Sequence, residues 1–167
     1  MASFLAVPSA SAAPQYIDLQ NPVFTEYATS DTWQSSVVKP GPVSMLLSDA
    51  AKRVIGEAGL MRLRDFIQLQ AGWDGRASRP LNLSSVTAFS AFFDKTRFFP
   101  AKMGIFMSAQ GNVVVNWPDA AGKLVELEFN SLRVDYFIES SGVEESVAMG
   151  ASGFNQILDE IKRHEAA

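Results

Sequence analysis

Carboxylates are the side chains of this chain that are best suited to chemistry. Glu126 and Glu128 stand two residues apart, so they share one face of an expected strand, and Asp135 on the next strand can join them. Grouped carboxylates bind hard cations or act as an acid and base pair. Most such strand faces are simply solvated, and an acidic sheet face also suits a basic partner. We rank the interpretations as solvated face, docking surface and, last, metal site.

A further carboxylate, Asp74, lies in the segment Gly72-Trp73-Asp74-Gly75. Two glycines around a Trp-Asp pair predict a tight turn that holds a large ring and a carboxylate in place. We expect Trp73 to be a core anchor and Asp74 to bind backbone amides of its own turn. In the alternative interpretation, Asp74 is an exposed carboxylate that reaches a partner or a ligand.

Other sources of catalysis are sparse in the sequence. His164 is the only histidine and falls in the last turn of the final expected helix, where the helix dipole favours it without a catalytic role. The chain has no cysteine, which excludes disulfides, thiolate metal sites and cysteine nucleophiles. There is no Gly-x-Ser-x-Gly elbow and no phosphate-binding glycine loop. We therefore expect no catalytic residue, no metal site and no cofactor.

Composition and charge restrict the classes of partner. The 167 residues fit one domain plus a tail, and 47% of them are hydrophobic, enough to bury a core. The net charge is −4 and the basic residues are scattered, which argues against nucleic acid and favours another protein, with a basic one easiest to accommodate. No apolar run approaches the roughly 18 residues of a membrane span, and the start lacks the features of a signal peptide. These features predict a cytoplasmic protein.

Residues 1–43 differ in composition from the rest of the chain. They are rich in Ser, Ala, Pro and Thr, and their five prolines prevent a long helix. They also carry isolated aromatic residues, which pure linkers rarely do; those that we predict to contact a partner are Tyr16, Phe24, Tyr27 and Trp33. Residues 1–43 are either an unstructured leader or an extended arm that lays these rings on its own domain or on a partner. Residues 44–167 form the predicted domain.

The domain begins with helical periodicity. Ser44 is a plausible N-cap for a helix that runs to Gln70, with a break allowed near Gly56 and Gly59. Gly72 then occupies the position at which a left-handed residue commonly ends a helix.

Two further helices are expected. Ser84 or Ser85 caps a helix that continues to about Phe98, just before a proline. Residues 142–150 read as a flexible acidic connection, and Ser152 caps the final helix.

Between these helices the hydrophobic period changes to two, which is typical of strands with one wet face. The expected strands cover 103–107, 113–117, 123–129 and 132–138, with turns at 109–112, 121–122 and 130–131. The predicted fold class is α+β: a four-stranded antiparallel meander packed with two helices before it and one C-terminal helix, preceded by the extended arm.

The motif order carries a resemblance. Leu-x-x-Gly-Trp-Asp-Gly, an Ala and a Pro, a helix, a glycine hairpin and a strand ending in Trp resemble small bacterial and phage-borne proteins associated with mobile elements. The matching residues are Gly72, Trp73, Asp74, Gly75, Ala77, Pro80, Gly111, Trp117, Leu124 and Glu126 to Glu128. The resemblance covers roughly residues 60–138, and Arg76 stands where many relatives have Tyr-Gly. It implies an accessory protein of a mobile element, in a group without a settled activity in which some members resemble toxin-neutralising proteins.

These features predict a non-enzymatic protein-binding module: an antitoxin-like, immunity-like or phage-encoded inhibitor. It would bind through its aromatic arm residues and through Glu126 and Glu128. One alternative is a phage or complex assembly subunit that self-associates through sheet edges or its arm and forms a homo-oligomer. The other is a carboxylate-based enzyme or small-ligand binder centred on Asp74, Glu126 and Glu128.

Overall fold

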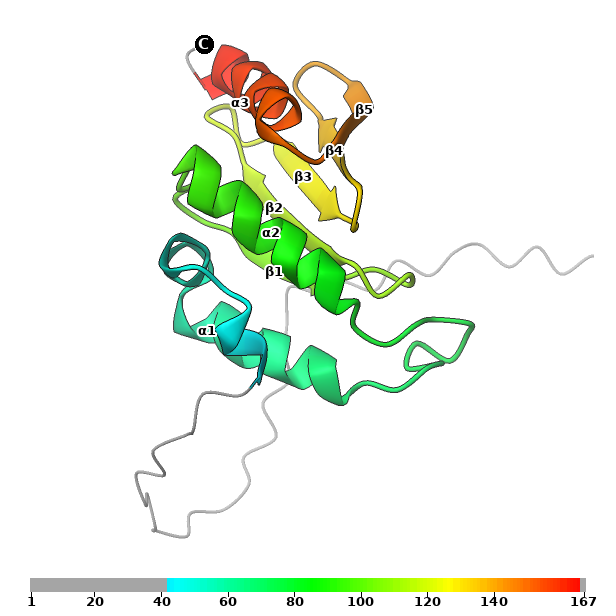
Figure 1. The fold of residues 1–167 in the computed structure, drawn as a ribbon. Helices are drawn as coiled ribbons and strands as arrows, with labels where there is room; N and C mark the ends of the chain where they lie inside the picture. Colours follow the sequence, from blue (N-terminus) through cyan, green and yellow to red (C-terminus); the bar gives the residue numbers. More distant parts are fainter. Residues whose placement is uncertain (1–41, 166–167) are drawn as a thin grey trace, which may run out of the picture. The chain divides into compact units, whose positions relative to one another are not determined.

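The computed structural model describes residues 42–165, in which an antiparallel sheet is backed by helices (Figure 1). The elements are η1 (Pro42–Met45), α1 (Asp49–Gln68), α2 (Leu83–Thr96), β1 (Gly104–Met107), β2 (Val113–Pro118), β3 (Leu124–Phe129), β4 (Arg133–Ile138), β5 (Val143–Ala148) and α3 (Ala151–Glu165). The short helix η1 crosses the expected domain boundary, and Val43 within it is buried. The predicted arm contacts Tyr16, Phe24, Tyr27 and Trp33 lie outside the described residues.

The sheet is a meander in which each strand pairs antiparallel with the next, in the order β1-β2-β3-β4-β5. The α+β class and the antiparallel sheet are confirmed. Val125, Leu127 and Phe129 are buried on one side of β3, as their alternation predicted.

The prediction of four strands is wrong, because residues 142–150 contain a fifth strand, β5, instead of a flexible connection. Three consecutive polar residues, Glu144, Glu145 and Ser146, interrupt the expected alternation. Glu145 occupies a position on the helix side of the sheet and accepts a hydrogen bond from the Tyr136 hydroxyl at 2.8 Å. Gln156 of α3 donates to the same carboxylate. A polar network therefore replaces the apolar side chain that the pattern requires.

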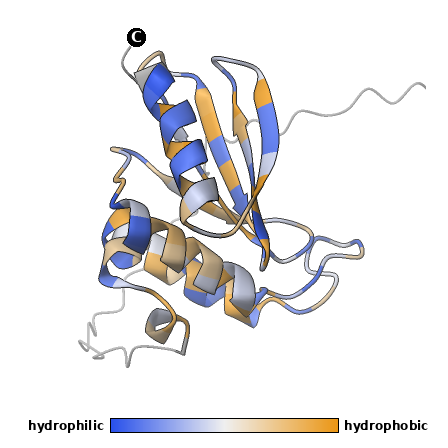
Figure 2. Ribbon diagram, turned by 45° about the horizontal axis from the view of Figure 1, so that its top comes forward, coloured by the Kyte–Doolittle hydropathy of each residue, from blue (hydrophilic) through white to orange (hydrophobic). Residues whose placement is uncertain are grey.

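All three helices pack on one face of the sheet. α1 contacts β1, α2 contacts β2 and β3, and α3 contacts β5. Figure 2 shows apolar and polar positions alternating along the strands, as expected when one face is buried. The core is dominated by a phenylalanine cluster with ring centroids 5.0–5.6 Å apart at its closest contacts. Its members are Phe89, Phe92, Phe93, Phe129 and Phe154.

Helix α1 starts later than its sequence predicts. Its N-cap is Ser48, not Ser44, because the Ser48 hydroxyl accepts the Ala51 N–H and the Ser48 N–H donates to the Ser90 hydroxyl of α2 at 2.7 Å. The expected break is present at Gly56, which adopts φ 62° and ψ −170°. The helix ends at Gln68.

Ser84 and Ser85, the predicted caps of α2, lie within its first turn and do not cap it. Asn82 is the N-cap and accepts the Ser84 N–H. Ser85 is fully buried, donates to the Phe129 carbonyl and accepts the Val113 N–H at 2.6 Å. One hydroxyl thus joins α2 to both β2 and β3.

Candidate functional site

The Gly-Trp-Asp-Gly segment forms an exposed loop between α1 and α2. Gly72 does not end α1, which stops earlier; its positive φ of 80° instead serves a turn closed by the Gly75 N–H on the Gly72 carbonyl. Trp73 is 37% exposed and lies outside the core, so its assignment as a core anchor is wrong. Its indole N–H donates to the Arg79 carbonyl at 3.1 Å and steadies the loop.

Asp74 organises the backbone of this same loop, as predicted. Its carboxylate accepts the Arg76 N–H at 2.8 Å, and its own N–H donates to the Ser78 hydroxyl. Two hydrogen-bonding groups hold the pKa of Asp74 below its usual value: the Ser78 hydroxyl contributes most, and the Arg76 N–H contributes next. Asp74 is therefore stabilised as a carboxylate by its own turn.

The loop is tied to the turn between β1 and β2. The Arg79 N–H donates to the Ala109 carbonyl and the Asn82 N–H to the Gly111 carbonyl, both at 2.8 Å. The loop and the hairpin, which carry the motif glycines, therefore form one connected structural unit.

Trp117, the last aromatic residue of the motif, belongs to the core. It is 3% exposed and packs against Phe98 with centroids 5.6 Å apart. Its indole N–H is buried and has no hydrogen-bond partner among the described residues.

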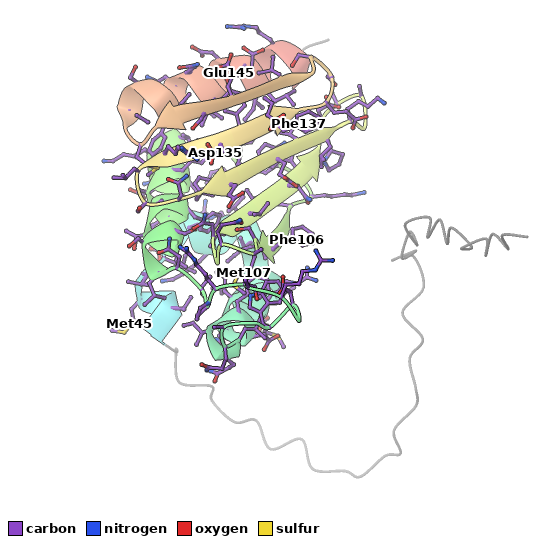
Figure 3. The ribbon with its side chains drawn as sticks, turned by 90° about the vertical axis from the view of Figure 1, so that its right-hand side faces the viewer. Met45, Phe106, Met107, Asp135, Phe137 and Glu145 are labelled. Carbon is purple, nitrogen blue, oxygen red and sulfur yellow. The ribbon has the colours of Figure 1, made fainter. Side chains whose placement is uncertain are left out.

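The opposite face of the sheet is not covered by any helix of residues 42–165, and we call it the open face. Its side chains include Phe106, Val114, Asn116, Leu124, Glu126, Glu128, Arg133, Asp135, Phe137, Glu144 and Ser146. Figure 3 labels Phe106, Asp135 and Phe137, which come from the strands β1 and β4. The open face brings Glu126, Glu128 and Asp135 together, as the sequence predicted.

Two of these carboxylates are engaged within the fold. Glu128 accepts hydrogen bonds from the Ser108 hydroxyl at 2.8 Å and the Asn112 amide at 2.9 Å. Asp135 pairs with Arg133 at 3.0 Å and also accepts from Asn130. These carboxylates hold turns of the sheet as well as contributing charge to its surface.

The other two flank an aromatic ring. In the strand register Phe137 of β4 stands opposite Glu126 of β3 on one side and Glu144 of β5 on the other. No hydrogen bond or ion pair within residues 42–165 engages the carboxylate of Glu126 or Glu144. A shallow hollow of about 120 Å³ lies here. Its lining residues are Glu126, Glu128, Asp135, Tyr136, Phe137 and Glu144.

Sequence reasoning missed Phe137 and Glu144. The signal for Phe137 was a large apolar residue at a position of β4 whose neighbours in the alternation are polar. Glu144 could not be placed because its strand was not recognised.

The arrangement offers negative charge and an aromatic ring. Asp74 does not line the hollow that contains Glu126 and Glu128. Among the described residues, no three His, Cys, Asp or Glu side chains are grouped closely enough to hold a metal ion. His164 falls in the last turn of α3. No described helix is both long and apolar enough to span a membrane.

No family model, curated protein or solved structure matches the chain. The open face itself therefore provides the basis for a functional proposal.

Proposed function

We propose that this protein is a non-enzymatic protein-binding module that docks a basic partner on the open face of its sheet. The observation that carries the proposal is the row formed by Glu126, Phe137 and Glu144, in which a ring lies between two carboxylates that have no partner among the described residues. We call these three residues the Glu-Phe-Glu row.

An arginine of the partner fits this row better than any other side chain. Its planar guanidinium stacks on an aromatic face and forms strong hydrogen bonds to carboxylates. Phe137 supplies the ring, and Glu126 and Glu144 supply acceptors on both sides of it.

The charge of the whole chain supports the same kind of partner. The net charge is −4, so long-range attraction favours a basic protein and speeds its approach. The biological role that we propose is inhibition of that protein in an antitoxin-like, immunity-like or phage-encoded manner. Tyr16, Phe24, Tyr27 and Trp33 are proposed as additional contacts from the arm.

The test is affinity capture from the source organism's lysate with the tagged full-length chain. The variant is Glu126→Gln/Glu144→Gln, which removes two charges and keeps the side-chain shape. The control is Glu57→Gln, which removes one charge from an exposed position on α1. We expect a stoichiometric partner that the control retains and the double variant loses, with at least about a tenfold fall in affinity for the purified pair.

Two results would contradict the proposal. One is a partner that the double variant binds as tightly as the unchanged chain does. The other is an eluate that contains only copies of this chain, which would favour the assembly-subunit alternative.

A further inference from the structure

Strand β5 is the last strand of the sheet, and the direction of its backbone groups follows from the alternation of hydrogen bonds between the strands. Bonded and non-bonded residue pairs alternate along an antiparallel ladder. The Met149 N–H donates to the Leu132 carbonyl at 2.9 Å, which sets the phase between β4 and β5. On the other side of β4, the Glu139 N–H donates to the Leu124 carbonyl. Strand β4, which lies between β3 and β5, thus forms hydrogen bonds to β5 through its even-numbered residues and to β3 through its odd-numbered residues.

This phase decides which backbone groups of β5 point away from the sheet. The residues whose N–H and carbonyl groups face β4 are Val143, Glu145 and Val147. Those of Glu144 and Ser146 therefore point outward, and both residues are exposed. No described residue forms a backbone hydrogen bond with these outward groups. Beyond Ser146 the edge is closed, because the Ala148 carbonyl lies against Gly153 of α3.

We propose that the basic partner adds an extended strand to this free edge of β5. The inference rests on the proposed function and specifies how the partner binds: by main-chain hydrogen bonds to the outward groups of Glu144 and Ser146. Strand addition to an exposed edge takes affinity from the main chain and specificity from alternate side chains.

The two sides of the edge define the chemistry of the added strand. On the open face the strand would pass beside Glu144, which favours lysine or arginine there. On the helix side a groove of about 440 Å³ lies between β5 and the first turn of α3. Its lining includes Val147 and Met149, which suit an apolar side chain. Glu145 lies on the helix side between Glu144 and Ser146, where Tyr136 and Gln156 donate hydrogen bonds to its carboxylate. The fitting strand therefore alternates basic and apolar residues.

A second copy of this chain fits the same edge poorly. Antiparallel pairing of two β5 edges centred on Glu144 or on Glu145 would place identical carboxylates directly opposite each other. Like charges in that position destabilise a strand pair and protect edges against self-association.

The experiment uses the full-length chain and an alternating lysine-valine heptapeptide with blocked ends, followed by residue-resolved amide hydrogen exchange. At saturating peptide we expect exchange of the Glu144 and Ser146 amides to slow by about tenfold or more, because both become hydrogen-bonded. The same peptide with glutamate in place of lysine should give no protection.

Ser146→Pro provides the matched variant. Its N–H points outward, so proline removes a docking donor without removing a bond of the β4–β5 ladder. Ser146→Ala changes the side chain and keeps the donor. We expect the proline variant to lose the peptide and the alanine variant to retain it. If the proline variant fails to fold, hydrogen exchange of the Glu144 and Ser146 amides in the unsubstituted chain still tests whether the peptide binds this edge.

The outcomes separate this inference from the proposed function. Peptide that binds and perturbs Phe137 without protecting Glu144 and Ser146 would overturn the edge inference and leave the docking face standing. If the peptide binds the Glu126→Gln/Glu144→Gln variant as tightly as it binds the unchanged chain, the result would count against the docking face. The absence of any protection at millimolar peptide would overturn the edge inference outright.

Discussion

The carbonyl oxygen of Pro80 lies only 2.0 Å from the point that a Cβ atom on Gly111 would occupy. The hairpin turn and the loop before α2 therefore approach each other more closely than any side chain at position 111 allows. The Asn82 N–H, which donates to the Gly111 carbonyl, fixes this approach. This close contact is by itself enough to require a glycine at position 111.

Gly111→Ala should destabilise the domain strongly. The substitution adds a clash with backbone atoms to the strain of an alanine at φ 80°, and together these should cost at least about 2 kcal/mol. Gly122→Ala is the control, because Gly122 has φ 77° and no atom lies within 4 Å of the point that its Cβ would occupy. Urea unfolding of both variants measures the difference. Equal losses of stability would show that the Pro80 contact relaxes freely.

Trp73→Ala should have a small effect on stability, near 1 kcal/mol, because the ring is partly exposed and its main bond is the one to the Arg79 carbonyl. Phe92→Ala is the comparison: Phe92 is fully buried, and its loss should cost about 3–5 kcal/mol. Thermal and urea unfolding give both values. A Trp73 variant as unstable as the Phe92 variant would show that the indole anchors the core after all.

Ser85→Ala should destabilise the domain by about 2 kcal/mol or more. It leaves the buried Phe129 carbonyl and Val113 N–H without their hydroxyl partner. The adjacent Ser84 is exposed, so Ser84→Ala should change the free energy of unfolding by less than about 0.5 kcal/mol. Similar losses at the two positions would contradict the bridging role of Ser85.

Stability should depend on pH through Tyr136. Burial contributes most to raising the pKa of Tyr136 from 10.0 to about 12, and the hydrogen bond to Glu145 contributes next. The folded state retains this proton at pH values where the unfolded state has lost it. The stabilising contribution is therefore complete below pH 10 and is lost as the pH rises through 12.

The free energy of unfolding, measured against pH for the unchanged chain and for Tyr136→Phe, checks this expectation. Over that interval the unchanged chain should lose stability relative to the variant. Parallel curves would mean that Tyr136 ionises equally readily in both states.

The sequence predicts the sheet well where side chains follow the burial rule. Val125, Leu127 and Phe129 alternate with acidic residues, and the structure buries all three. The rule fails at Glu145, because a carboxylate on the helix side that accepts a hydrogen bond from Tyr136 looks the same in sequence as one that faces solvent. Cross-strand hydrogen bonds of this kind join residues whose proximity only the register reveals.

The candidate site was half predictable for the same reason. Glu126 follows from alternation along one strand, whereas its relation to Phe137 and Glu144 depends on the order of three strands. The misassigned cap at Ser85 has a parallel cause. Serine near a helix start usually caps the helix. Here the Ser85 hydroxyl instead forms hydrogen bonds to backbone groups of β2 and β3.

The packing of all three helices on one face divides the strands into two independent sets of positions. Alternate residues of the sheet either fill the core or face outward, so outward residues that hold no turn, such as Glu126, Phe137 and Glu144, can change without altering the packed set. Natural selection can therefore substitute residues of the open face to suit a new binding target while the fold is retained. The same separation makes the domain a practical scaffold for laboratory libraries that randomise only outward positions.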